Sequence, residues 1–421
     1  MITTFTNARL VDPETGTDSP GSLTIENGHI TARDAAPSGE VIDCAGQYLA
    51  PGIIDIGVKI GEPGERHKES FRTAGEAAAA GGVTTMVTRP DTTPPIDTPE
   101  MLEFFRTRAA ALCAVHVLPM AALTKARAGA EMAELGFLTD AGAVAFSDGD
   151  SPVPNAKTLS RLLAYAAADN ALVIGHAQDP QLSAGAAATS GALAAKMGLP
   201  AVSALAERLR LEHDLTLVEA TGARYHIDQI TTAAALPALA RARAAGLRVT
   251  AGISIHHLTL NEFDIEGYRS FFKFKPPLRC EDDRMAMVQA LAAGEIDIIC
   301  SLHTPQDEES KRLPFADAAS GAVGLETLLS AALQLVHAGH ISLGQLFATL
   351  SLNPAKLLGL PAGRLAIGAP ADMVLFNPNT PYILDRSKLH SKSKNTPYDG
   401  RRMQGRVLGT WVAGRQVWGQ G

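Results

Sequence analysis

Eight short apolar runs alternate along the middle of the chain with Ala- and Leu-rich stretches, such as 99–110 and 204–220, that have helical periodicity. The runs span residues 52–59, 83–88, 114–121, 142–147, 171–176, 223–228, 247–255 and 296–302. This alternation is typical of βα units around a parallel sheet. Because eight units close a (β/α)8 barrel, the sequence predicts an α/β fold of the TIM-barrel type, with functional groups at the carboxyl ends of the strands.

Both ends of the chain instead carry short strand-like runs separated by turns. Asn27-Gly28, flanked by β-branched residues, predicts a hairpin. Residues 371–376 and 407–412 have the same texture near the other end. Two strand-rich ends can pair into one small domain. We therefore predict a β-sandwich whose first part is 1–49 and whose second part is 365–421, with the barrel formed by 50–364.

Charge and composition restrict the partners. The 37 basic and 44 acidic side chains give a net charge of −7, without a long run of like charges, which disfavours nucleic-acid and lipid surfaces. The sequence lacks a membrane-length apolar stretch and a signal-peptide pattern at its start. Its four cysteines form no CxxC pair. We expect a cytoplasmic protein with reduced thiols that binds neither nucleic acid nor membrane.

Short motifs follow the predicted strands in order over nearly the whole chain. They are Pro51-Gly52-Ile53-Ile54-Asp55, Glu62-Pro63-Gly64, Gly81-Gly82-Val83-Thr84-Thr85, Phe146-Ser147-Asp148, His256-His257-Leu258-Thr259, Lys273 with Pro276-Pro277-Leu278-Arg279, Gly324-Leu325-Glu326-Thr327 and Ser391-Lys392-Ser393-Lys394-Asn395-Thr396-Pro397. Together they make the chain resemble the dihydroorotases of the amidohydrolase superfamily. The resemblance implies a metal-dependent hydrolase barrel with zinc, a composite β-sandwich, and the interconversion of N-carbamoyl-aspartate and dihydroorotate.

The residues that this resemblance assigns to the metal are mostly replaced here. The chemistry needs a Lewis acid, a metal-bound hydroxide and a carboxylate that moves the proton. Aligned with the family, six positions, called here the metal-ligand positions, would supply them. They are Gly57, Lys59, Gly149, His176, Gln229 and Leu302, the last at the place of the catalytic aspartate. His176 alone keeps a ligand, so we predict no catalytic residue, no bound metal and no other cofactor.

Three further positions, called here the substrate positions, also depart from the family. Gly61 replaces an arginine, Asp91 an asparagine and Gln306 a histidine. A carboxylated substrate favours a bidentate cation and is repelled by a new carboxylate. We therefore expect weakened recognition of the family's substrate.

A relocated metal site is the alternative for the remaining polar residues. Its candidate ligands are His67, His226, His256, His257 and His303 with Asp148, Asp150 and Asp228. We favour packing roles for the histidines, with His226 and His303 pointing away from the site. Lys59 is then a charged group in the metal's place rather than a catalytic or carboxylated lysine. It is expected to pair with Asp55, Asp148, Asp150 or Asp228, opposite Leu302.

The resemblance extends to non-catalytic dihydroorotase-like proteins that associate with aspartate carbamoyltransferase. The favoured function is therefore a metal-free structural partner of that enzyme's catalytic chain, within a homo- or hetero-oligomer. Motifs that persist at 324–326 and 391–397 are interpreted as a retained surface. An active dihydroorotase, or another cyclic amidohydrolase with a rearranged metal site, is the alternative. A cytoskeletal or signalling scaffold like the non-catalytic dihydropyrimidinase relatives matches the motifs less well.

Overall fold

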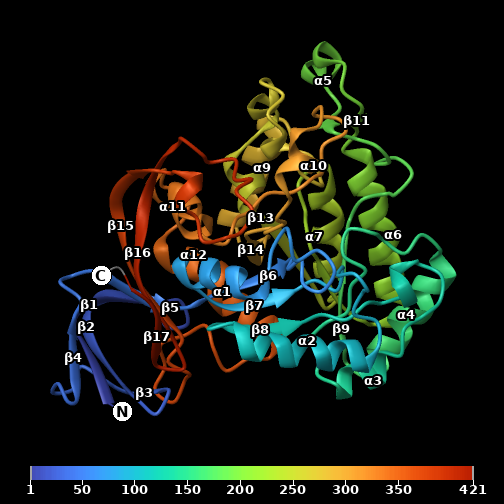
Figure 1. Ribbon diagram of the computed structural model, residues 1–421. Coiled ribbons are helices and arrows are strands. Elements are labelled where there is room, and N and C mark those ends of the chain that lie inside the picture. Colours follow the sequence, from blue (N-terminus) through green and yellow to red (C-terminus); the bar gives the residue numbers. More distant parts are fainter. Residues whose placement is uncertain (1, 420–421) are drawn as a thin grey trace.

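A computed structural model describes residues 2–419 and contains the predicted barrel (Figure 1). Its strands are β6 (Ile53–Val58), β7 (Val83–Thr88), β8 (His116–Pro119), β9 (Leu172–Gly175), β12 (Arg224–Ile227), β13 (Val249–Ser254) and β14 (Ile298–Cys300). β6, β7 and β8 pair in parallel, as do β9, β12, β13 and β14. The apolar, β-branched composition of these strands fits a sheet that is covered on both faces.

The fourth predicted run is shorter than expected. Within 142–147, Phe146 forms isolated bridges to Ala121 on one side and to Val173 on the other. It thereby joins the two groups of strands without forming a strand of its own. The opposite seam is closed where Lys59 N donates to His303 O at 2.9 Å. The ring of eight positions is complete, although one of them is reduced to a bridge.

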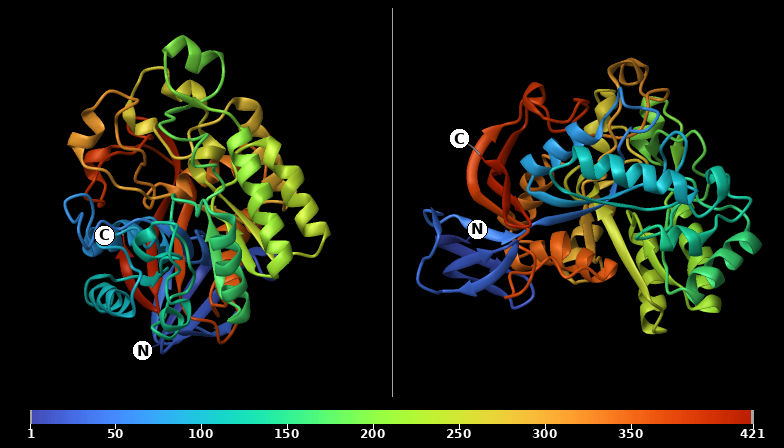
Figure 2. Two further views of the ribbon diagram at one scale, coloured as in Figure 1. Left: turned by 90° about the vertical axis from the view of Figure 1, so that its right-hand side faces the viewer. Right: turned by 60° about the horizontal axis from the view of Figure 1, so that its bottom comes forward.

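Helices pack outside the ring, as Figure 2 shows from two further sides. The longer ones are α1 (Phe71–Ala80), α2 (Pro99–Leu112), α4 (Ala156–Ala168), α6 (Leu205–Thr221), α7 (Leu236–Ala244), α9 (Glu281–Ala292) and α11 (Leu328–His337). Shorter ones are α3 (Leu135–Asp140), α5 (Ala192–Met197), α8 (Ile255–Thr259), α10 (Glu308–Arg312), α12 (Leu343–Phe347) and α13 (Asn353–Leu358). The predicted helices at 99–110 and 204–220 are confirmed as α2 and α6. Among the described residues, no helix combines the length and the apolar character that crossing a membrane requires.

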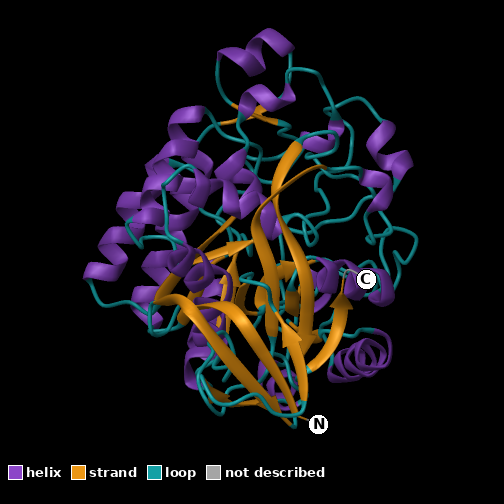
Figure 3. Cartoon of the chain, turned by 90° about the vertical axis from the view of Figure 1, so that its left-hand side faces the viewer, coloured by secondary structure: helices purple, strands orange, loops and turns teal. Residues whose placement is uncertain are grey.

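The two chain ends share one sheet, which faces the viewer in Figure 3, in front of the barrel. Its strands are β1 (Ile2–Asp12), β2 (Thr17–Glu26), β3 (His29–Arg33), β4 (Glu40–Asp43), β5 (Tyr48–Pro51), β15 (Met373–Ile383), β16 (Arg402–Val412) and β17 (Arg415–Gly419). β5 pairs antiparallel with β15 and so joins the ends. Asn27 and Gly28 both have positive φ in the β2–β3 turn, as the hairpin motif predicted. The composite β domain is thus confirmed.

Candidate functional site

Four of the metal-ligand positions border one small cavity at the carboxyl end of the barrel. Gly57, Gly149, Gln229 and Leu302 line a space of about 20 Å³, which is room for about one water molecule. Gly57 has a φ of 94° and Leu302 a φ of 49°, so both follow a left-handed backbone. Leu302 is buried, with 6 % of its surface exposed. Four of the positions that the resemblance assigns to a metal therefore do converge here, but with few donor atoms.

Arg89, directly after β7, lines the same cavity. Its guanidinium donates to Asp91 through Nη2–Oδ2 at 2.8 Å and Nε–Oδ1 at 3.1 Å. Its Nη2 also lies 3.5 Å from Asp150 Oδ1. A Cβ built on Gly149 would lie 2.9 Å from that same Nη2. The guanidinium therefore fills the room that a metal-binding side chain at 149 would need.

The charges of this group are fixed by their neighbours. Burial alone lowers the pKa of Arg89, but Asp91 and Asp150 raise it above its ordinary value. Burial likewise raises the pKa of Asp91, whereas Arg89 and Lys59 hold it below its ordinary value. The pairs therefore remain charged at neutral pH. Sequence analysis missed Arg89, although a basic residue immediately after an apolar strand was a usable signal.

Lys59 has different partners from those predicted. Its Nζ lies 3.3 Å from Asp91 Oδ2 and 3.6 Å from Glu65 Oε2. Asp91 follows β7, the strand next to the one that leads to Lys59, so neighbouring strand ends bring the two charges together. Burial raises the pKa of Glu65, but Lys68 and Lys59 lower it overall. The ammonium is paired as expected, but its partners Asp91 and Glu65 are not among the four carboxylates that the sequence suggested.

The four carboxylates expected near Lys59 have other partners. Asp55 accepts hydrogen bonds from the backbone N–H of Ser301 at 2.8 Å and from its hydroxyl, and burial raises the pKa of Asp55 to about 6. Asp148 accepts from the backbone of Leu123 and Thr124 at 2.9 and 3.0 Å. Asp150 pairs with Lys275 at 3.2 Å as well as with arginines. Asp228 binds His176.

The two remaining polar metal-ligand positions are held by protein groups. His176 Nδ1 lies 3.1 Å from Asp228 Oδ2, which fixes the orientation of the ring. Gln229 Oε1 accepts from the backbone N–H of Ser254 at 2.8 Å, and its Nε2 lies 3.2 Å from Cys300 Sγ. The amide of Gln229 thus ties neighbouring strand ends together. This arrangement gives it a structural role.

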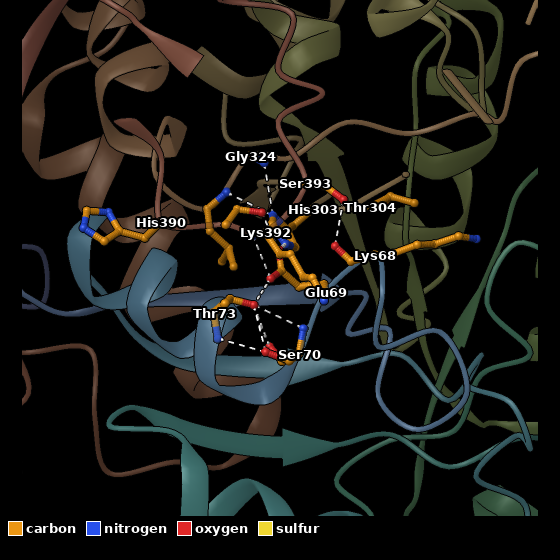
Figure 4. Close-up of polar contacts among 12 residues, drawn as sticks. Lys68, Glu69, Ser70, Thr73, His303, Thr304, Gly324, His390, Lys392 and Ser393 are labelled. Atoms are coloured by element: carbon orange, nitrogen blue, oxygen red, sulfur yellow. Dashed lines mark hydrogen bonds and ion pairs between the residues drawn. The ribbon is translucent and has the colours of Figure 1, made fainter. Parts of the chain in front are cut away.

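A buried carboxylate next to the ring organises the surrounding loops. Glu69, just before α1, accepts hydrogen bonds from the hydroxyls of Thr73 and Ser391, and from the backbone N–H of Lys392 at 3.0 Å. His303 Nε2 lies 3.5 Å from Glu69, and its Nδ1 accepts from Gly324 N at 3.2 Å. Figure 4 shows Glu69, Thr73, His303 and Lys392 converging from segments that are far apart in the sequence. We call this group, Glu69 with Thr73, His303, Ser391 and Lys392, the Glu69 network.

The persistent motifs are largely interior. Ser391, Asn395 and Thr396 are buried, as is Gly324. Glu326 accepts from the backbone of His390 and Ser391 at 2.7 and 3.0 Å. Their interpretation as a retained surface is therefore wrong. These motifs hold the loop that precedes β16 onto the barrel mouth, so they report a preserved fold.

Comparison with known proteins assigns the family. Residues 46–235 match the family described as "Dihydro-orotase-like", and residues 331–418 match the "Amidohydrolase family". A dihydroorotase from Wolbachia (strain wRi) is 37% identical, over 99% of this chain and 95% of its own. The chain belongs to the dihydroorotase family. A "Dihydroorotase-like protein" from Pseudomonas putida is 38% identical over 98% of both chains.

Solved structures show the same architecture in other amidohydrolases. The L-hydantoinase from Arthrobacter aurescens superposes with a TM-score of 0.90 at 24% identity, covering 100% of this chain and 96% of its own. The dihydropyrimidinase from Brevibacillus agri gives 0.85 at 23%, covering 100% and 95%. The TIM barrel with a β-sandwich from both chain ends is thus the fold of this dihydroorotase-family chain.

The zinc of the dihydroorotase family does not fit these residues. Zinc sites use several converging imidazole, thiolate or carboxylate ligands. Among the residues that the structure describes, no three such side chains are placed to hold a metal. Instead, Arg89 and Lys59 bring two cations to the ring, and they already pair with Asp91. A divalent ion would compete with both for the same carboxylate.

The other histidines of this family member have structural surroundings. His226 binds Thr250 Oγ1 through Nδ1 at 2.8 Å, and burial lowers its pKa to about 4. It nevertheless borders the inner cavity, so the prediction that it points away is wrong. His257 binds Ser254 Oγ at 2.7 Å and Pro276 O at 3.1 Å. Burial lowers the pKa of His256 to about 3.

The substrate positions do not offer the family's binding groups. A Cβ on Gly61 would lie 2.3 Å from the carbonyl oxygen of Glu65, so a side chain there requires the backbone to move. Asp91 is committed to Arg89 and Lys59. Gln306 Nε2 donates to Ser320 O at 2.9 Å. At these three positions too, the side chains differ from those that the resemblance implies, and Asp91 and Gln306 are bound to other groups of the protein.

Proposed function

We propose that this protein is a metal-free, non-catalytic member of the dihydroorotase family. In this role it serves pyrimidine biosynthesis in the cytoplasm as a structural partner of aspartate carbamoyltransferase. The observation that carries the first part is the guanidinium of Arg89, which lies against Gly149 and lines the same cavity as four of the metal-ligand positions. A tethered cation there leaves a zinc ion without a site.

The lost chemistry follows from the groups that remain. Hydrolysis of a cyclic amide by this family's route needs a Lewis acid and a carboxylate that carries the proton. Leu302 stands at the carboxylate's position and offers no acid or base. His176 is held by Asp228 and lacks further metal ligands around it. The described residues therefore support binding or assembly better than turnover.

The partnership with aspartate carbamoyltransferase is carried over from the resemblance. The loop contacts around Glu69 are intact in this fold, whereas most metal-ligand positions lack a ligand. A structural partner needs a folded barrel mouth but does not need a bound metal. The protein would then act in a hetero-oligomer, and the cell would need a second, intact dihydroorotase.

Two measurements on the purified proteins test this function. Mixed at micromolar concentration, this protein and aspartate carbamoyltransferase should elute from gel filtration as one species, whose mass by light scattering equals that of a complex. A stable complex of this kind buries at least about 1,000 Å². This protein should not interconvert N-carbamoyl-aspartate and dihydroorotate. Two independent peaks with unchanged transferase activity would contradict the partnership. Turnover would instead support the competing function, an active dihydroorotase, which the names of the relatives favour.

A further inference from the structure

A second cavity, of about 250 Å³, lies between the β domain and the helices α1 and α11. The residues that line it are Ala80, Glu326, Ser330, 382–385, 388–390, 405–407 and Trp418. In the described chain, none of the metal-ligand or substrate positions belongs to this lining. The cavity is therefore separate from the mouth of the barrel.

Most of the lining is apolar or aromatic. Leu384 and Leu389 supply aliphatic side chains, and Tyr382 and Trp418 supply rings. The hydroxyl of Tyr382 donates to Ser330 Oγ at 2.9 Å, which holds that ring in place. A concave, largely apolar space with a few polar groups is typical of small-molecule sites, and aromatic walls favour a ligand with an aromatic ring.

Two neighbouring rings offer one free acceptor and one free donor. His390, whose ring points away from Glu69 in Figure 4, has its Nδ1 2.9 Å from Glu326 Oε2. The carboxylate therefore holds Nδ1–H and leaves the lone pair of the neutral ring at Nε2. Trp418 lies edge-on to His390, with ring centroids 4.8 Å apart. Its Nε1 is buried and, like His390 Nε2, has no hydrogen-bond partner among the described residues. A hydroxyl group, which both donates and accepts, can satisfy the two nitrogens together.

The cavity also contains two cations without an ion-pair partner. Lys388 and Arg406 line it, and neither lies within ion-pair distance of a carboxylate among the described residues. Arg406 Cζ lies instead 4.5 Å from the centroid of the Tyr382 ring. Glu326 and Asp385, the two acidic residues of the lining, already accept hydrogen bonds from protein donors. The two cations are therefore available to an anionic group of a ligand.

We propose that this cavity binds a small aromatic carboxylate that carries a ring hydroxyl, of the hydroxyphenylacetate class. The carboxylate pairs with Lys388 and Arg406, and the aromatic ring packs in the apolar part of the lining. The hydroxyl donates to His390 Nε2 and accepts from Trp418 Nε1. Each of the three parts of the ligand thus meets groups that the protein leaves unpaired.

Matched ligands test these contacts without altering the protein. The probe for isothermal titration calorimetry is 4-hydroxyphenylacetate. Its analogues are 4-methoxyphenylacetate, which cannot donate a hydrogen bond, and 4-hydroxyphenylacetamide, which lacks the charge. We expect the probe to bind and each analogue to bind at least about tenfold more weakly. No binding of the probe at millimolar concentration would overturn the proposal, as would equal affinity of either analogue.

Tryptophan fluorescence locates the bound probe. The chain has two tryptophans, of which Trp418 lines the cavity and Trp411 is buried in the core of the β domain. Saturation with 4-hydroxyphenylacetate should change the emission of the parent protein, and Trp418→Phe should remove that change. A change that persists in Trp418→Phe would place the ligand elsewhere and contradict the assignment.

A pair of lysine variants completes the test. Lys388→Gln should weaken 4-hydroxyphenylacetate about tenfold, whereas Lys356→Gln, at an exposed lysine of α13 outside the cavity, should leave the affinity unchanged. Equal thermal unfolding of both variants and the parent would show that folding is intact. Unchanged affinity in Lys388→Gln would contradict the proposed ion pair. Association with aspartate carbamoyltransferase is measured separately, so the two proposals fail independently.

Discussion

The Glu69 network and the metal-ligand positions lie at the same end of the barrel, yet they differ in how their polar groups are partnered. Around Glu69, both carboxylate oxygens accept from hydroxyl or backbone donors, which come from Thr73 of α1 and from Ser391 and Lys392 of a distant loop. At the metal-ligand positions, glycine, leucine and an amide stand in place of ligands, and the guanidinium of Arg89 lies against Gly149. The difference shows that the residues which hold the loops of the barrel mouth together can be present without the residues which would bind a metal.

The largest effect is expected from breaking the Glu69 network. Glu69→Ala removes a fully buried carboxylate and leaves the Ser391 hydroxyl and the Lys392 N–H without their acceptor. We expect a loss of about 4 kcal/mol in the free energy of unfolding, measured with urea. Glu308→Ala, which removes an exposed pair with Arg312, is the control and should cost less than about 1 kcal/mol. Similar losses in both variants would show that the network contributes little.

A smaller loss in the free energy of unfolding is expected from a change beside the metal-ligand positions. Arg89→Met removes the bidentate partner of Asp91, but Lys59 still pairs with that carboxylate, and Lys275 with Asp150. We therefore expect about 2 kcal/mol of destabilisation in the same assay. Arg312→Met, at an exposed pair, is the matched control. A variant as stable as the parent would mean that Arg89 fills space without holding the ring together.

The smallest effect concerns pH. The pKa of His226 is lowered by burial from its ordinary value of 6.5 to about 4. Its contribution to stability is therefore present above pH 6.5 and is lost as the pH falls toward 4, because the unfolded chain binds the proton first. At pH 5.5 the expected loss is about 1 kcal/mol. His226→Asn should show a correspondingly shallower decline between pH 7 and 5.5, and an unchanged slope would contradict this origin.

Repeating patterns made most of the fold predictable, because many residues share in each of them. The alternation of apolar runs gave the barrel, and Asn27-Gly28 gave a turn that requires positive φ. The run at 142–147 was overestimated, since its composition does not reveal that Phe146 alone bridges both neighbours. Bridges of that kind depend on the neighbouring strands rather than on local sequence.

The site was less predictable, because its partners come from distant loops. Loss of ligands at Gly57, Gly149 and Leu302 is visible in the sequence. The choice of Asp91 and Glu65 by Lys59 depends on how two strand ends and a loop meet. The role of Arg89 was not predicted, because the resemblance assigns metal ligands only to six other positions. Its role became apparent through its distance to Gly149.

Metal content tests the central account most directly. The protein, purified from zinc-supplemented medium without chelator, would be analysed by inductively coupled plasma mass spectrometry beside its Arg89→Met variant. The account predicts far less than one zinc per chain in the parent, because Arg89 and Lys59 hold the ring as ion pairs. It predicts the same for the variant, since removing one cation does not restore ligands. About one or two equivalents of zinc in the parent, accompanied by turnover of dihydroorotate, would contradict it.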